Sequence, residues 1–307
     1  MLRSSLDAMA LSFKGNLLRT KALHKFCFIT TLFLIAITSE SFAVTQTLYI
    51  NRGSFVTIKK TSFPALSVNA TPVYDAHNAV ISATPGQLLD LTIVNNDSVL
   101  HGFSIAGFPS QSVTIKPAAS ALIHLTIDKE GIYLYYDSVQ YPSFLYLGAA
   151  GMIVASNSTR RSFFWNIREY ESSLNENLVH GGTFSKTSYD PDFFTINGLS
   201  YPDIQNDTTA KVMGSVGDTL RIYLANTGQS MHSIHFHGFH TRCLFSTSQN
   251  IKTGWVKDTW AIRSMQAVIL ELVVDKPGRY SVHDHNLVAI SAAKTHPNGM
   301  FTIMEMK

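Results

Sequence analysis

Histidines in two short clusters near the end of the chain are the residues most able to do chemistry. The chain has 12 histidines, and the first cluster, MHSIHFHGFH, contains His232, His235 and His237. The second cluster, VHDHNLVAISAAKTHPNGM, contains His283, His285 and His296. Alternate side chains of a strand project from one face, so two neighbouring strands that each carry a His-x-His pair bring four imidazoles together. This spacing predicts a metal site.

The order of these residues resembles the last domain of a multicopper oxidase, in which His-x-x-His-x-His-Gly is followed by a His-x-His pair and then by His and Met. Imidazole suits copper, and a thioether such as that of Met300 favours it further, although the same imidazoles suit zinc. By this resemblance the position of Asp284 belongs to a type 1 copper together with His232, His296 and Met300. His235 would face the type 2 copper. The type 3 pair would be faced by His237, His283 and His285.

Asp284 departs from the family pattern, because the family has a cysteine between the two histidines of the second pair. A carboxylate is a hard oxygen ligand and cannot form the copper–sulfur bond of a blue centre. Asp284 therefore either binds a metal through oxygen or orients a ligating imidazole. Cys243 lies six residues after His237, and we interpret it as a small buried hydrophobe.

An internal repeat relates the two halves of the chain. QLLDLTIVNNDSVLHGFSIAGF follows Pro85-Gly86, and DTLRIYLANTGQSMHSIHFHGF follows Val216-Gly217. In both copies the histidine comes 15 residues after the glycine, so His101 aligns with His232. The same comparison aligns Asp137 with Asp284. It also aligns Gly151-Met152 with Gly299-Met300.

The first copy lacks most of the ligand-type histidines, because the aligned residues are Ser104, Ala106, Tyr136 and Ser138. The resemblance implies that a complete trinuclear centre takes four His-x-His pairs from two domains, so we expect an incomplete copper set. Four imidazoles could hold one copper or zinc ion, or three could bind and leave a position open for water or dioxygen. The resemblance also implies a homotrimer and a small reductant as electron donor.

Length and composition favour two packed domains. The chain has 307 residues, of which 45% are apolar and 15% are charged. Short alternating strands separated by Gly, Pro and Asn turns, without long amphipathic helices, predict an all-β fold. The expected architecture is two tandem cupredoxin-like Greek-key β-sandwiches, with limits of 44–158 and 186–307 and a connecting segment at 159–185.

Residues 1–43 have the pattern of a secretory signal peptide. Basic residues precede an apolar run at 26–37, and Ser41-Phe42-Ala43 is a typical cleavage site. This predicts a periplasmic or secreted protein. The leader carries five of the 24 basic and two of the 21 acidic residues, so 19 of each remain and the mature chain has no net charge. Nothing in that balance indicates a nucleic-acid partner.

Taken together, these patterns predict an exported copper-binding protein that is, if active, a copper-dependent oxidoreductase. The alternatives are a non-catalytic protein that binds or sequesters copper and a structural cupredoxin-like protein without metal. The isolated histidines are interpreted as hydrogen-bonded structural residues; they are His77, His101, His124 and His180. We find no nucleophile elbow, phosphate loop or dinucleotide fingerprint.

Overall fold

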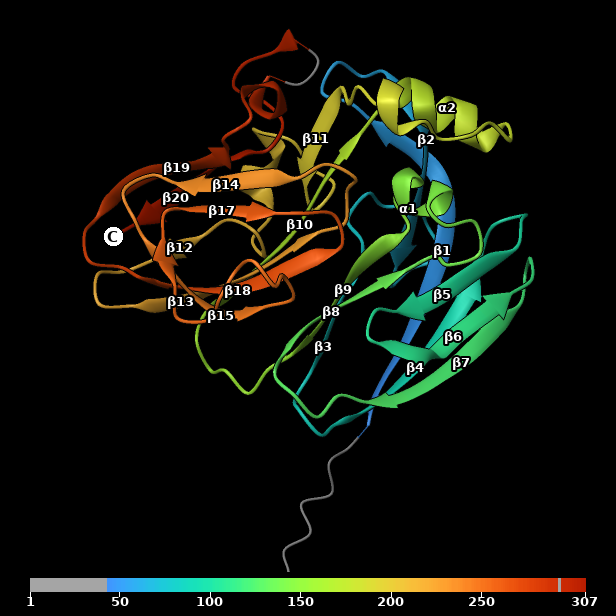
Figure 1. The fold of residues 1–307 in the computed structure, drawn as a ribbon, viewed down its shortest axis with the longest axis horizontal. Coiled ribbons are helices and arrows are strands. Elements are labelled where there is room, and N and C mark those ends of the chain that lie inside the picture. Colours follow the sequence, from blue (N-terminus) through green and yellow to red (C-terminus); the bar gives the residue numbers. More distant parts are fainter. Residues whose placement is uncertain (1–42, 292–293) are drawn as a thin grey trace, which may run out of the picture. The chain divides into compact units, whose positions relative to one another are not determined.

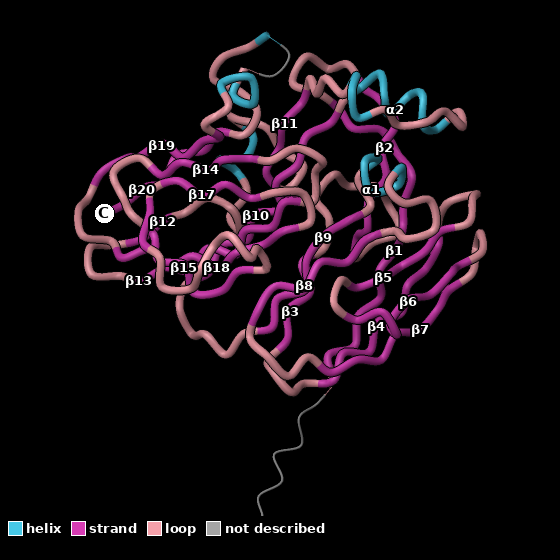
Figure 2. Tube along the Cα trace, viewed as in Figure 1, coloured by secondary structure: helices cyan, strands magenta, loops and turns pink. Residues whose placement is uncertain are grey.

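The structure, a computed structural model, describes residues 43–291 and 294–307. The predicted leader lies outside the described residues except for Ala43. Strands from the first half of the chain lie together, and those of the second half lie beside them (Figure 1). Strands account for most of the regular structure (Figure 2), which confirms the predicted all-β fold. None of the described helices is long and apolar enough to cross a membrane.

The first sandwich consists of a four-stranded and a five-stranded sheet. In spatial order the four-stranded sheet contains β2 (Ser62–Asn69), β1 (Val44–Val56), β4 (Leu88–Asn95) and β7 (Ser120–Thr126). The five-stranded sheet contains β3 (Val80–Ala83), β9 (Ala150–Ala155), β8 (Gly131–Tyr136), β5 (His101–Ile105) and β6 (Phe108–Ile115).

The second sandwich consists of a six-stranded and a five-stranded sheet. The six-stranded sheet contains β11 (Phe193–Ile196), β10 (Ser162–Tyr170), β13 (Thr219–Asn226), β18 (Gln266–Val273), β15 (Thr241–Ser246) and β16 (Val256–Lys257). The five-stranded sheet contains β12 (Met213–Gly214), β20 (Phe301–Met306), β19 (Gly278–Asp284), β14 (His232–Phe236) and β17 (Thr259–Ile262).

Helices are short and lie between strands. The α-helices are α1 (Ser143–Leu147) and α2 (Ser172–Val179). Single 3₁₀ turns cover Lys186–Ser188, Asp203–Asn206 and Leu287–Ile290. Both β10 and α2 fall within the predicted connecting segment, and β10 pairs in parallel with β13 just as β1 pairs with β4. The domain limits themselves stay a prediction.

The two sandwiches repeat the same topology. The order β3-β9-β8-β5-β6 corresponds strand for strand to β12-β20-β19-β14-β17. His101 opposes Ile115 in the first copy, and His232 opposes Ile262 in the second. Each histidine is the first residue of its strand. The predicted alignment of His101 with His232 is therefore confirmed.

One part of the predicted alignment is wrong. The amide of Asp137 donates to the carbonyl of Ala149, and the amide of Asp284 donates to the carbonyl of Met300. The equivalent of Gly299-Met300 is therefore Gly148-Ala149 rather than Gly151-Met152. The loop before this dipeptide differs in length between the copies, so the shared Gly-Met letters at 151 and 152 matched by coincidence.

Each sandwich has its own hydrophobic core, and two further clusters join them. Strand β13 shows how the sequence serves two interfaces, because its residues alternate between faces. Leu220, Ile222 and Leu224 enter the core of the second sandwich. Tyr223 and Ala225 on the other face pack against β8 and β9 of the first sandwich. The strand is buried on both faces and anchors the two sandwiches to each other.

Candidate metal centre

The two predicted His-x-His strands are neighbours in one sheet. β14 and β19 are antiparallel, with His235 directly opposite His283 and Ile234 opposite Asp284. The amide of His285 donates to the carbonyl of Ser233, which extends the pairing past the end of β19. Adjacent antiparallel strands bring directly opposed and diagonal side chains within reach of each other. The sheet therefore brings both pairs together, as their spacing predicted.

Alternation divides the predicted ligands between the two faces of this sheet. His235, His237, His283 and His285 lie on the outer face, where they are partly or fully exposed. His232 and Asp284 lie on the inner face and are fully buried. Side chains on opposite faces cannot share an ion. The two groups are distinct sites.

The four outer imidazoles form a compact cluster, which we call the outer histidine cluster. Ring centroids are 4.6 Å apart for His235 and His237, 5.5 Å for His235 and His285, and 5.1 Å for His237 and His283. The Nε2 atoms of His237 and His283 are 2.9 Å apart. Two nitrogens bound to one ion at about 2.0–2.1 Å would be separated by roughly 3 Å. This diagonal pair has the spacing of two ligands of one ion.

Hydrogen bonds select which nitrogen of two of these rings faces the cluster. His283 Nδ1 lies 2.8 Å from the carbonyl oxygen of Asp284. A carbonyl only accepts, so Nδ1 carries the proton and, in the neutral ring, Nε2 keeps the lone pair that a metal needs. His235 Nδ1 lies 2.8 Å from the hydroxyl of Thr259. The backbone at the end of β19 and a side chain of β17 therefore orient the two opposed rings.

The cluster environment favours neutral imidazole. Burial and the neighbouring rings of His235 and His283 lower the pKa of His237 below its usual value. A metal ligand must be deprotonated, so a lowered pKa favours binding near neutral pH. The residue types and protonation thus fit copper or zinc. Among residues 43–291 and 294–307, however, no group of three or more His, Cys, Asp or Glu side chains is arranged so that it could hold a metal ion.

On the inner face, His232 lies between two carboxylates. Its Nδ1 is 2.6 Å from Asp284 Oδ2, and its Nε2 is 2.7 Å from Glu169 Oε2. Glu169 comes from β10 in the opposite sheet of the sandwich. Ionised carboxylates only accept, so both ring nitrogens donate and His232 is an imidazolium. In this arrangement His232 has no free lone pair for a metal.

Ionisation of this group agrees with its geometry. Burial alone would lower the pKa of His232, but its bonds to Asp284 and Glu169 outweigh burial and raise it to about 9. Burial alone would raise the pKa of Glu169, but His232 and the amide of Ser230 lower it to about 2. The amide of Gln229 and the hydroxyl of Tyr189 also donate to Glu169. A buried charge is tolerated only with such partners.

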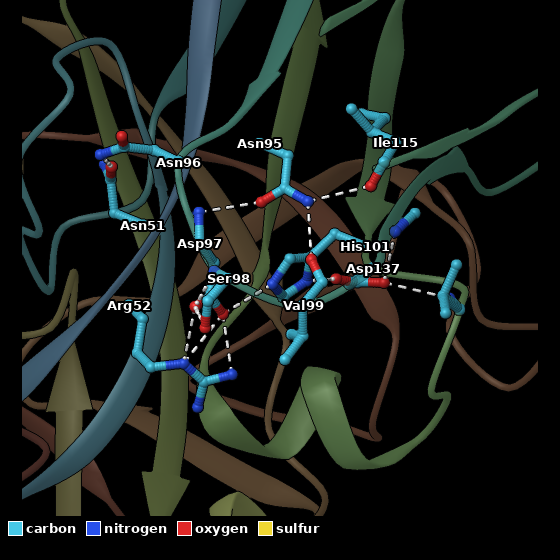
Figure 3. Close-up of polar contacts among 12 residues, drawn as sticks. Asn51, Arg52, Asn95, Asn96, Asp97, Ser98, Val99, His101, Ile115 and Asp137 are labelled. Atoms are coloured by element: carbon cyan, nitrogen blue, oxygen red, sulfur yellow. Dashed lines mark hydrogen bonds and ion pairs between the residues drawn. The ribbon is translucent and has the colours of Figure 1, made fainter. Parts of the chain in front are cut away.

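The first sandwich contains a twin of this arrangement (Figure 3). His101 Nδ1 is 2.5 Å from Asp137 Oδ2, and His101 Nε2 is 2.8 Å from Asp97 Oδ2. Arg52 then contacts Asp97 through Nε at 2.8 Å. His101 and Asp137 are fully buried, as are their counterparts. Each sandwich therefore holds an imidazolium between two carboxylates, and we call these groups the first and second ion triples.

The second carboxylate of each triple comes from a different position. By the pairing of β1 with β4 and of β10 with β13, Arg52 corresponds to Glu169 and Asp97 corresponds to Gly228. A Cβ at position 228 would overlap the Glu169 carboxylate. Gly228 thus leaves the space into which Glu169 extends. The second carboxylate therefore comes from the loop after β4 in the first sandwich and from strand β10 in the second. The local chemistry around the histidine is the same in both.

The remaining predicted ligands lie outside the outer histidine cluster. His296 is exposed, with Nδ1 3.1 Å from the carbonyl of Ile290. Met300 is fully buried in the core of the second sandwich. Cys243 is buried on β15 in the six-stranded sheet, where its Sγ donates to the carbonyl of Phe245. The predicted set of eight residues therefore divides into an outer cluster, a buried ion pair, an exposed histidine and a core methionine.

Sequence reasoning missed Glu169, Asp97 and Arg52. Glu169 lies 63 residues before its histidine partner, so no local spacing connects the two. For Asp97 a local signal was present, because it precedes His101 by four residues. Arg52 and Glu169 lie in strands that contain other polar residues, so nothing in the pattern marked them. The contacts of His101 fit its interpretation as a hydrogen-bonded structural residue.

Comparison with known proteins agrees with this architecture. Residues 176–297 match the multicopper oxidase family profile. This part of the chain is similar to the multicopper oxidases. The matched region contains all four residues of the outer histidine cluster. No curated protein matches the chain by sequence.

Several solved structures share this multicopper oxidase fold. A blue copper oxidase from Nitrosomonas europaea has 20% identity and a TM-score of 0.72, with 85% of each chain covered. The multicopper oxidase mgLAC has 18% identity and a TM-score of 0.72, with 86% of each chain covered. A copper nitrite reductase from Nitrosomonas europaea has 16% identity and a TM-score of 0.68, covering 86% of this chain and 94% of its own. At these identities the likeness establishes the fold alone, two cupredoxin-like domains.

Proposed function

We propose that this is an exported protein that binds copper at the outer histidine cluster. The observation that carries the proposal is the convergence of four imidazoles from β14 and β19, with the Nε2 atoms of His237 and His283 2.9 Å apart. Exposed histidines on a strand pair have no packing reason to gather in this way. The similarity of residues 176–297 to the multicopper oxidase family supports copper over zinc.

The chain's own residues determine how such a site would work. His283 presents Nε2 because the carbonyl of Asp284 holds its Nδ1 proton. In the metal-free state the Nε2 proton of His237 bridges to His283, and this proton must leave before both rings can bind one ion. Bound copper would supply one-electron redox chemistry and an open position for dioxygen. His237 and His285 are exposed, so a small reductant could reach the cluster.

We propose that the copper set is incomplete. Asp284 stands at the position where the family has a cysteine, and its carboxylate is bound to His232. Ser104, at the position of His235, hydrogen-bonds to Ser112 in the first sandwich. These residues therefore do not form a blue copper centre that could pass electrons to the outer histidine cluster. A copper carrier without turnover is the second candidate, favoured because the described part of the chain places no thiolate near the cluster.

Copper titration with matched variants tests the proposal. We expect the wild-type protein to bind copper tightly, without the intense absorption near ~600 nm of a copper–thiolate site. His237→Ala and His285→Ala should each weaken binding at least about 10-fold, and the double change should cost less than the sum because both rings serve one ion. His124→Ala, which removes an exposed histidine hydrogen-bonded to Asp90, is the control.

The outcomes separate the candidate functions. Equal losses of copper affinity in the control variant and in the cluster variants would mean that copper binds adventitiously, and would refute the site. Oxygen consumption by the copper-loaded protein with a small reductant would identify an oxidase. Tight binding without oxygen consumption would identify a carrier. Absence of binding would support a structural protein.

A further inference from the structure

The second ion triple joins the two sheets of the sandwich at the strand ends that carry the outer histidine cluster. Glu169 belongs to β10 in the six-stranded sheet, whereas His232 and Asp284 belong to β14 and β19 in the five-stranded sheet. Asp284 is the last residue of β19, between His283 and His285. His232 begins β14, three residues before His235. The same two strands therefore hold the triple on one face and the cluster on the other.

Asp284 is bound through every polar group it has. Its Oδ1 accepts from the amides of Ser233 and Asn286, at 3.1 and 3.0 Å. Its Oδ2 accepts from His232, and its amide donates to Met300. Its carbonyl accepts the Nδ1 proton of His283. The residue that selects the tautomer of His283 is thus itself fixed by the buried triple.

The first sandwich shows that this device does not depend on a metal. Asp137 accepts from the amides of Gly102 and Val139, at 2.9 and 3.0 Å, and binds His101. Its neighbours are Tyr136 and Ser138, which replace the two histidines. The first ion triple therefore provides the same cross-link in a copy without a histidine cluster, and it is a natural internal control.

We propose that Glu169 and Asp284 are positioning residues for the outer histidine cluster. Through protonated His232 they cross-link β10, β14 and β19 and hold the ends of the two His-x-His strands in register. The cation that fixes this end of the second sandwich is an imidazolium rather than a metal ion. The effect of these residues on copper binding rests on the function proposed above. Their effect on strand register and on the His283 tautomer does not depend on that function.

Charge-removing variants of matched shape test the inference. Asp284→Asn and Glu169→Gln keep the size of each side chain and remove one partner's charge. Asp137→Asn makes the same change in the first ion triple. We expect Asp284→Asn and Glu169→Gln to weaken copper binding about 10-fold or more, as loss of a group that orients a ligand usually does. Asp137→Asn should lower stability to a similar extent and change copper affinity less than about twofold.

A readout on the metal-free protein separates this inference from the proposed function. Nitrogen-15 NMR of the histidine rings should show His283 protonated at Nδ1 in the wild type and in Asp137→Asn, but a mixture of tautomers in Glu169→Gln and Asp284→Asn. If the wild type fails to bind copper, this spectrum still decides the inference. If either Glu169→Gln or Asp284→Asn does not fold, the other variant supplies the comparison.

Two results would overturn the inference. The first is an unchanged His283 tautomer in both Glu169→Gln and Asp284→Asn. The second is an equal loss of affinity in Asp137→Asn, since a change in the distant copy can act only through overall stability.

Discussion

At the residue scale, two histidines are held as buried imidazolium ions, and this has a pH signature. Burial alone would lower the pKa of His101, but its bonds to Asp137 and Asp97 raise it above its usual value. Burial alone would raise the pKa of Asp97, but its bonds to His101 and Arg52 lower it. The carboxylate contribution to stability is present above about pH 4 and is lost as the pH falls. The histidine contribution is complete below about pH 6.5 and is lost as the pH rises through the raised value.

We therefore expect the free energy of unfolding to decline as the pH rises from about 6.5 to 9, the value to which the pKa of His232 is raised. Urea denaturation across this range measures the decline. His101→Gln should lower the free energy of unfolding by about 3–5 kcal/mol, because it leaves two buried carboxylates without their cation. It should also make the decline of this free energy with rising pH less steep. His124→Gln, at an exposed position, should change neither quantity. A flat profile in the wild type would show that the rings are neutral.

At the element scale, the strands that hold these ions could be predicted only in part. Alternating apolar residues and Pro-Gly or Val-Gly turns identified β4 and β13 and gave the correct register for His101 and His232. The loop before Gly148 differs in length from the loop before Gly299, so the alignment failed beyond Asp137. The partner of His232 could not be found from sequence, because Glu169 reaches it from another sheet. Which face each histidine occupies followed only once the strand pairing was known.

The exchange of partners between the copies gives an element-scale prediction. Gly228→Asp should destabilise the second sandwich by about 2 kcal/mol or more, since the new carboxylate competes with Glu169 for His232 and for space. Glu169→Arg should do the same, because it places a second cation beside the imidazolium. Together the changes recreate the Arg52 and Asp97 pair of the first sandwich. The double variant should be more stable than either single variant.

Thermal denaturation of the three variants checks this exchange. A higher melting temperature in the double variant than in either single variant would show that strand position 169 and loop position 228 are coupled, as the repeat implies. A double variant whose loss equals the sum of the single losses would show that the two copies do not share this geometry.

At the scale of the whole molecule, the outer histidine cluster lies on a sheet face that residues 43–291 and 294–307 leave open. Among the described residues only the four cluster imidazoles converge there, and the first sandwich offers serine, alanine and tyrosine at the aligned positions. We expect one copper ion, and at most two, per chain, whatever the number of chains in the assembly. Metal analysis combined with sedimentation measures both quantities. Three or four tightly bound ions per chain would contradict the assignment, and a mass of three chains would agree with the trimer implied by family resemblance.

The cluster that joins the two sandwiches has a consequence for how this duplicated chain could diverge. Ile132, Leu134 and Val154 on the outer face of β8 and β9 pack against β13 and β18 of the second sandwich. By the strand pairing, the corresponding residues of the second copy are Arg279, Ser281 and Glu305, which are polar. In the first sandwich this sheet face packs against the second sandwich. In the second sandwich the same face carries polar side chains and the outer histidine cluster. The repeat therefore gives the molecule two equivalent sheet faces, and among the described residues only the face in the second sandwich is left uncovered to present a binding site.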